Sequence, residues 1–226
     1  MGIPFKICGL TRPQDVEACC RAGAALCGFV TEYPQPVPWN LTRAQCGALL
    51  PLVRPPAKSC LVTGGSRGQV LALAAALRPR LVQLQYRETL ADNAALCRAL
   101  APLGIGVLQA LPPTPGARRE LLGSPEPEAC AKALCQAGVW GILVDARQPG
   151  PGAAAGGAAD PGLYRRVRAA SSRPVLLAGG IRPENCAQLA ALARPDGVDV
   201  MTGVEDAPGI KSPRKIQALA AALAAL

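Results

Sequence analysis

Short apolar runs alternate along the chain with longer Ala- and Leu-rich segments whose apolar residues recur every three or four positions. The short runs are typical of buried strands, and the longer segments are typical of amphipathic helices. We predict eight strands, over Phe5 to Cys8, Leu26 to Val30, Ser59 to Thr63, Leu81 to Gln85, Gly106 to Ala110, Gly141 to Val144, Pro174 to Ala178 and Val198 to Met201. The predicted helices between and after them are Pro13 to Ala22, Arg67 to Leu77, Leu90 to Leu100, Pro127 to Ala137, Gly162 to Ala170, Pro183 to Ala193 and Pro213 to Leu226.

The alternation of strand and helix predicts a parallel sheet. Eight such units in 226 residues fit an α/β fold of the (β/α)8 TIM-barrel type, as a single domain over residues 1–226. An open doubly wound sheet is the alternative. The chain lacks the Gly-x-Gly-x-x-Gly pattern after its first strand and the Walker A pattern that nucleotide-binding sheets carry. The barrel is therefore the favoured fold.

Three Pro- or Gly-rich connections interrupt the regular alternation. Thr31 to Asn40 holds three prolines and a tryptophan, and Arg147 to Pro161 is rich in Gly, Ala and Pro. We interpret both as mobile loops at the end of the barrel where catalytic groups lie. Pro112 to Pro127 is interpreted either as a third such connection or as an ordinary insertion.

The composition removes several kinds of chemistry. The chain has no histidine, which excludes Ser-His-Asp and Cys-His mechanisms and the common His-containing zinc and iron sites. Its ten cysteines are scattered without Cys-x-x-Cys spacing, so we expect mostly reduced thiols that act as small apolar fillers. No apolar stretch of 18 residues and no secretory leader pattern appear, which predicts a cytoplasmic protein without a membrane partner.

The formal net charge of +9 is suited to a phosphorylated or carboxylated small molecule. A basic chain can also bind nucleic acid, but these Lys and Arg residues are dispersed and only seven aromatic residues are present to stack on bases. A bias of composition toward Arg is the simpler explanation of the charge. We expect a phosphorylated small-molecule substrate and no nucleic-acid partner.

Two residues stand where strands of a barrel give way to loops, which is where catalytic groups of this fold lie. Cys8 ends the first predicted strand, and Gly9 behind it lets the backbone bend without a β-carbon clash. The helix that starts at Pro13 favours a thiolate nearby. Asp145 follows the sixth strand, where partial burial would raise the pKa of a carboxyl so that it can donate a proton. The alternatives are a buried filler thiol and an aspartate that caps the next turn.

Two glycine-containing loops follow the seventh and eighth strands. Gly179 and Gly180 precede a predicted helix start, and Thr202 and Gly203 lie in the loop after the last strand. Glycines let backbone N–H groups approach a phosphate, and a helix N-terminus adds a favourable partial charge. Because barrels often bind phosphate between strands seven and eight, these four residues are the candidate phosphate site.

The chain resembles the phosphoribosylanthranilate isomerase family nearly end to end. The residues that carry the resemblance are Lys6-Ile7-Cys8-Gly9-Leu10-Thr11, Gly28-Phe29-Val30, Val82-Gln83-Leu84-Gln85, Leu143-Val144-Asp145, Leu177-Ala178-Gly179-Gly180-Ile181-Arg182-Pro183-Glu184-Asn185, Gly197-Val198-Asp199-Val200, Thr202-Gly203-Val204-Glu205 and Pro208-Gly209-Ile210-Lys211.

The resemblance implies an Amadori rearrangement of N-(5-phosphoribosyl)anthranilate in tryptophan biosynthesis. It assigns the general base to Cys8 and the general acid to Asp145, and it places Gln85 and Asp199 in the substrate pocket. It implies no cofactor and no metal, and we expect a monomer or a homodimer.

The chain departs from the family in its loops. The arginine that usually follows the second strand and meets the anthranilate carboxylate is missing, since no arginine precedes Arg43 in that region. Gln85 stands where the family has histidine, and Gly156-Gly157-Ala158-Ala159 lacks the usual loop hydroxyl. Three alternatives therefore stay open: a paralogue that isomerises another phosphosugar amine, a barrel that only binds a phosphosugar or a protein, and a cysteine-based redox sensor. A related histidine-pathway isomerase is disfavoured because such enzymes have a pair of aspartates at the acid and base positions, whereas this chain has Cys8 at the first of them.

Overall fold

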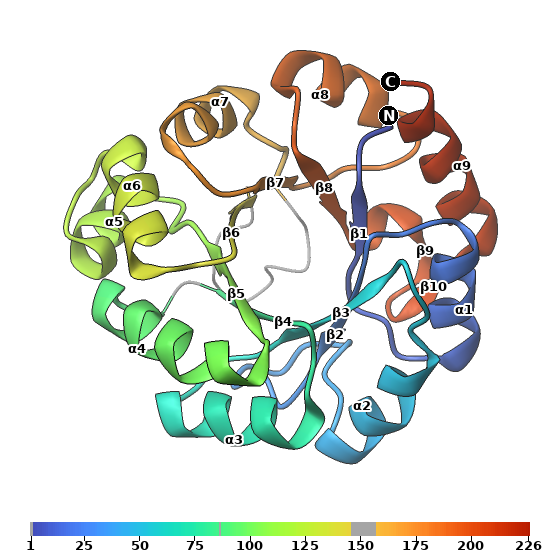
Figure 1. Ribbon diagram of the computed structural model, residues 1–226. Helices are drawn as coiled ribbons and strands as arrows, with labels where there is room; N and C mark the ends of the chain where they lie inside the picture. Colours follow the sequence, from blue (N-terminus) through green and yellow to red (C-terminus); the bar gives the residue numbers. More distant parts are fainter. Residues whose placement is uncertain (1, 86, 146–156) are drawn as a thin grey trace.

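A closed barrel of eight parallel strands forms the centre of the molecule (Figure 1). The structure is a computed structural model that describes residues 2–85, 87–145 and 157–226. The strands follow one another around the ring in chain order, as β1 (Phe5–Ile7), β2 (Leu26–Val30), β3 (Lys58–Val62), β4 (Leu81–Leu84), β5 (Gly106–Ala110), β6 (Gly141–Asp145), β7 (Val175–Ala178) and β8 (Gly197–Val200). Strand β8 closes the ring by pairing with β1. The predicted (β/α)8 fold is confirmed.

Helices surround the barrel on its outside (Figure 1). They are α1 (Pro13–Arg21), α2 (Arg43–Leu49), α3 (Arg67–Leu77), α4 (Leu90–Leu100), α5 (Pro115–Leu122), α6 (Pro127–Ala137), α7 (Pro161–Ala170), α8 (Cys186–Ala193) and α9 (Pro213–Ala224). A small antiparallel hairpin of β9 (Glu205–Ala207) and β10 (Ile210–Lys211) lies between β8 and α9. None of the described helices is long and apolar enough to cross a bilayer.

Capping groups explain why α3 and α4 begin where the sequence predicts. Ser66 accepts a hydrogen bond from the backbone N–H of Gln69, whose side chain returns to the N–H of Ser66. Thr89 and Asp92 form the same reciprocal arrangement at the start of α4. Each arrangement satisfies two backbone donors that have no partner within the helix. The first residue of each helix is fixed by these local side chains.

Three stretches of the chain differ from the predictions. The Pro-rich connection from Pro112 to Pro127 contains α5, and the Arg118 guanidinium donates to the carbonyl oxygens of Pro112, Pro113 and Pro125 on either side of that helix. The helix predicted to start at Pro183 starts three residues later, at Cys186. The Asn185 side chain accepts from the N–H of Arg182 and donates to the carbonyl of Gly180, which holds the intervening residues in a turn. Helix α2 was not among the predicted helices.

The two-residue period of the strands decides which side chains enter the barrel. One apolar cluster fills the interior and another packs between strands and helices. In β6, Leu143 belongs to the interior cluster, whereas Ile142 and Val144 belong to the outer cluster. The same alternation turns polar or reactive side chains inward, among them those of Lys6, Cys8, Gln85, Asp145 and Asp199. Every candidate catalytic and pocket residue therefore points into the barrel.

Candidate active site

Cys8 and Asp145 lie at the same end of the barrel on different strands. Cys8 directly follows β1, its side chain is buried, and its backbone N–H donates to the carbonyl of Val200 at 2.9 Å. Asp145 is the last residue of β6 rather than the first residue after it, and it is buried with an exposed fraction of 8%. Going round the ring through β7 and β8, β6 is three strands from β1, so the two groups face the barrel mouth from different sides. A molecule in the mouth can contact both.

The turn after Cys8 requires glycine. Gly9 has a positive φ of 72°, and a β-carbon there would lie 2.7 Å from the Met201 side chain and 2.9 Å from the Trp39 ring. The expected backbone bend at Gly9 is confirmed. The close packing of Trp39 and Met201 over this glycine fixes the position of the neighbouring Cys8 thiol.

A buried ion pair occupies the interior below the mouth. The Lys6 ammonium lies 3.0 and 2.9 Å from the two carboxylate oxygens of Asp199, and the Lys6 side chain is fully buried. Burial acts to lower the Lys6 pKa, but the charge of Asp199 and its hydrogen bond outweigh burial, so the pKa is raised. Sequence reasoning placed Asp199 in the substrate pocket and missed its partner. The signal was available, since Lys6 is a charged residue in a three-residue strand and shares its inward parity with Cys8.

The loops after β7 and β8 pack backbone against backbone. Gly179 and Gly180 have positive φ values of 110° and 58°. A β-carbon at Gly203 would overlap the carbonyl oxygen of Ile181, so only glycine allows the two loops to lie this close. Thr202 is exposed and begins a short 3-10 turn at the mouth. The four predicted phosphate-site residues thus lie in two adjoining loops after β7 and β8, which is where barrels of this fold often bind phosphate.

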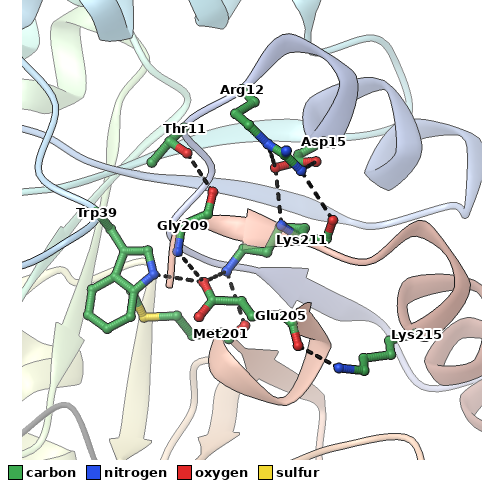
Figure 2. Close-up of polar contacts among 9 residues, drawn as sticks. All are labelled: Thr11, Arg12, Asp15, Trp39, Met201, Glu205, Gly209, Lys211 and Lys215. Carbon is green, nitrogen blue, oxygen red and sulfur yellow. Dashed lines mark hydrogen bonds and ion pairs between the residues drawn. The ribbon is translucent and has the colours of Figure 1, made fainter. Parts of the chain in front are cut away.

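A second buried carboxylate, that of Glu205, connects these loops to the rest of the mouth (Figure 2). One of its oxygens accepts from the Trp39 indole at 2.7 Å and from the Lys211 ammonium at 2.6 Å. Lys211 is fully buried and also donates to the carbonyl of Met201 at 3.0 Å. Burial lowers the Lys211 pKa even though the charge of Glu205 acts to raise it. Trp39 therefore packs within the protein.

The same cluster reaches the loop after β1 (Figure 2). Thr11 donates to the carbonyl of Gly209 at 2.7 Å. Asp15 forms an ion pair with Arg12 at 2.7 Å and accepts from the backbone N–H of Lys211 at 3.2 Å. Thr11, Glu205 and Lys211, which lie in motifs that carry the family resemblance, thus take part in one connected cluster. These contacts fix the loops after β1, β2 and β8 relative to one another.

A small surface cleft lies where β2, β3 and β4 end. Gln85, the residue predicted for the substrate pocket, lines this cleft, and its backbone carbonyl accepts from the Gln109 side chain at 2.5 Å. The remaining lining residues come from the loops after the same three strands, and they are Tyr33, Pro34, Gln35, Thr63, Gly64, Arg87 and Glu88. Burial raises the pKa of the Glu88 carboxyl. The cleft was not anticipated from the sequence, nor was Arg87 singled out.

Part of one predicted loop lies outside the described residues. The segment predicted as a mobile loop, Arg147 to Pro161, is described only from residue 157 onward, and Gly156 of the altered glycine motif lies outside it. The N–H of Ala159 donates to the carbonyl of Gly179 at 3.0 Å. The end of this connection is thus attached to the first of the two glycine loops.

The cysteines and the other potential metal ligands stay separate. All ten cysteines are free thiols, and burial raises the pKa of the fully buried Cys60 thiol to about 12. Cys60 accordingly behaves as an apolar filler of the barrel interior. Within residues 2–85, 87–145 and 157–226, no three His, Cys, Asp or Glu side chains gather so that they could hold a metal ion.

Comparisons with known proteins agree on one family. Residues 126–222 match the family model described as N-(5'-phosphoribosyl)anthranilate (PRA) isomerase. The chain is 34% identical, over its whole length and 93% of the relative, to N-(5'-phosphoribosyl)anthranilate isomerase of Azorhizobium caulinodans. It is 36% identical to the enzyme of that name from Bordetella petrii, over 95% of this chain and 91% of the relative. The crystal structure of phosphoribosyl anthranilate isomerase from Thermus thermophilus superposes with a TM-score of 0.77 and 29% identity, covering 99% of both chains.

Proposed function

The chain belongs to the N-(5'-phosphoribosyl)anthranilate isomerase family, and from this premise we propose that it catalyses the Amadori rearrangement of N-(5-phosphoribosyl)anthranilate to the aminoketose. This makes it an aldose–ketose isomerase, an intramolecular oxidoreductase, that acts in tryptophan biosynthesis. The observation that supports the assignment of roles is that Cys8 and Asp145 both project into one mouth from the carboxyl ends of β1 and β6.

The two groups suit the two proton transfers of the reaction. Asp145 donates a proton to the furanose ring oxygen while the bond from that oxygen to C1 breaks, and the nitrogen lone pair forms an iminium at C1. Cys8 then removes the proton from C2, whose electron pair forms the C1–C2 double bond and neutralises the nitrogen. The resulting enolamine becomes the ketose when C1 takes up a proton and the C2 hydroxyl loses one, so that a C2 carbonyl replaces the C1–C2 double bond. A thiolate is an adequate base because the adjacent iminium acidifies the C–H bond.

The phosphate is assigned to the two glycine loops. Gly179, Gly180, Thr202 and Gly203 lie beside one another after β7 and β8, and the positive φ values of the first two expose backbone rather than side chain to a ligand. Helix α8 begins after the turn at Asn185, so its N-terminus adds a favourable partial charge on the same side of the mouth. Inorganic phosphate should therefore inhibit competitively.

The first test is turnover by the wild-type protein. Freshly prepared phosphoribosylanthranilate is mixed with the protein, and isomerisation is followed as loss of anthranilate fluorescence. Turnover that scales with protein concentration supports the function. If the folded protein produces none, the altered loops have changed its substrate, and the paralogue alternative replaces the isomerase.

We expect Gly203→Ala to lower kcat/KM by roughly 10- to 100-fold, mainly through KM. The added β-carbon would overlap the carbonyl oxygen of Ile181, so one loop must move and its N–H groups lose their alignment with the phosphate. The measurement is steady-state kinetics, together with the inhibition constant of inorganic phosphate, which should rise in parallel.

Gly116→Ala is the matched control. Gly116 lies in α5 with no atom within 4 Å of a β-carbon, so alanine fits there and favours the helix. Thr202→Ala removes one hydroxyl without touching the Ile181 contact and provides a milder variant that keeps the fold. Unchanged phosphate inhibition in both Gly203→Ala and Thr202→Ala would contradict the phosphate assignment.

A further inference from the structure

The cleft at the ends of β2, β3 and β4 shares the barrel mouth with the proposed acid and base. Its lining residues all follow the carboxyl ends of their strands, as Cys8 and Asp145 do. Tyr33, which lines the cleft, packs against the small buried cluster that contains Cys8, Val30, Trp39 and Val62. Tyr33 therefore connects the cleft to the apolar cluster that contains the proposed base.

The position of the cleft matches one end of the substrate. In the closed ring, β3 and β4 lie opposite β7 and β8, where the phosphate is assigned (Figure 1). Phosphoribosylanthranilate has its phosphate at one end of the sugar and its carboxyphenyl group at the other, with the reacting carbons between them. With the phosphate at β7 and β8 and the reacting carbons between Cys8 and Asp145, the aromatic ring extends toward β2 to β4. The ring then needs an apolar wall, and its ortho carboxylate needs a cation.

Arg87 is the cation that lines this cleft. The backbone N–H of Arg87 donates to the Glu88 carboxylate at 3.3 Å, but no carboxylate of a described residue lies within ion-pair distance of its guanidinium. The neighbouring exposed arginines are engaged, Arg43 with Glu32 at 3.4 Å and Arg67 with Asp92 at 3.9 Å. The loop from Thr31 to Asn40 contains neither Lys nor Arg. Among the described residues that line the cleft, Arg87 is therefore the cation available to a carboxylate.

We propose that Arg87 binds the anthranilate carboxylate and so determines the specificity of this enzyme for a carboxylated aniline, an inference that rests on the proposed function. A guanidinium can hold both carboxylate oxygens through parallel N–H bonds, which an ammonium cannot do. The cation that recognises the aromatic acid thus comes from the loop after β4, whereas the loop after β2 contributes the apolar wall through Tyr33 and Pro34.

The test compares two substrates that differ only in the carboxylate, phosphoribosylanthranilate and phosphoribosylaniline, each with wild type, Arg87→Gln and Arg87→Lys. We expect Arg87→Gln to lower kcat/KM for the carboxylated substrate by roughly 10- to 100-fold and to leave kcat/KM for the aniline substrate unchanged. Arg87→Lys should recover part of the loss, because it restores the charge without the two parallel bonds. Arg43→Gln, which removes a nearby exposed charge paired with Glu32, should alter neither.

Binding gives a second readout that does not depend on turnover. Calorimetric titration with reduced 1-(o-carboxyphenylamino)-1-deoxyribulose 5-phosphate should show the same loss of affinity in Arg87→Gln. An equal loss for both substrates, or no loss for the carboxylated one, would overturn the role of Arg87 while leaving the isomerase standing. Absence of turnover of either substrate by wild type would instead overturn the isomerase, and the Arg87 inference with it.

Discussion

Replacing Asp145 with asparagine is expected to lower the turnover of phosphoribosylanthranilate by roughly 10²- to 10⁴-fold while the barrel stays folded. Asparagine has nearly the shape of aspartate but has no proton to give to the furanose oxygen, so ring opening loses its acid. Asp145 is buried, and its backbone pairs with β7. Because asparagine has the same shape, it keeps this packing and pairing, and the fold should not change. Stopped-flow fluorescence measures the turnover, and circular dichroism measures whether the barrel is folded.

Cys8→Ala tests the other proton transfer and should produce a loss of similar size. Cys97→Ala is the matched cysteine control, since Cys97 lies half-buried in α4 on the outside of the barrel. Combining Asp145→Asn with Cys8→Ala should cost less than the product of the single effects, because the two groups act in one reaction. Turnover within a factor of a few of wild type in either single variant would remove that residue from the catalytic machinery.

Lys6→Met is expected to reduce the free energy of unfolding by about 3–5 kcal/mol. Methionine fills the space of the lysine stem, but it leaves the Asp199 carboxylate buried without the ammonium that bonds both of its oxygens. Urea denaturation at pH 7 measures the change. Because the folded pKa of Lys6 is raised above 10.5, its stabilising contribution is fully present below that pH and declines as the pH rises further.

The double variant Lys6→Met/Asp199→Leu removes both charges of the ion pair but keeps the interior volume filled. Removing both charges should restore most of the stability, since an apolar pair of similar volume carries no desolvation cost. The difference between wild type and Lys6→Met should also narrow above pH 10.5. If Lys6→Met alone is as stable as wild type, water must reach the Asp199 carboxylate despite its burial.

The strands and the direction of their side chains were the most predictable features of this chain. Short runs such as Leu26–Val30 and Gly106–Ala110 are mostly apolar and are buried throughout or nearly so, so pattern and structure coincide there. The starts of α3 and α4, which capping boxes at Ser66 and Thr89 fix, were predicted, whereas α2 was missed although Thr42 forms the same capping box. The catalytic candidates follow from the same two-residue alternation, because each stands at the end of a recognised strand.

The contacts that sequence reasoning missed join residues far apart in the chain. Lys6 and Asp199 are separated by 193 positions, and Trp39 and Glu205 by 166. Neither partner identifies the other through spacing, because only closure of the barrel brings them together. The late start of α8 was missed for a local reason, since the Asn185 side chain competes with the helix for backbone partners. Arg87 was passed over because the cleft around it is formed by three separate loops.

The pairing of Lys6 with Asp199 also constrains the order in which the newly made chain can fold. The first strand is synthesised almost two hundred residues before its charge partner, and until Asp199 is in place the Lys6 ammonium lacks the carboxylate that bonds it in the folded interior. A nascent chain can assemble strands from β2 onward, but the ring cannot close around an unpaired ammonium. Closure of the barrel therefore requires β8 beside β1, and the mouth that holds Cys8 is complete only when these two strands, which lie far apart in the sequence, have paired.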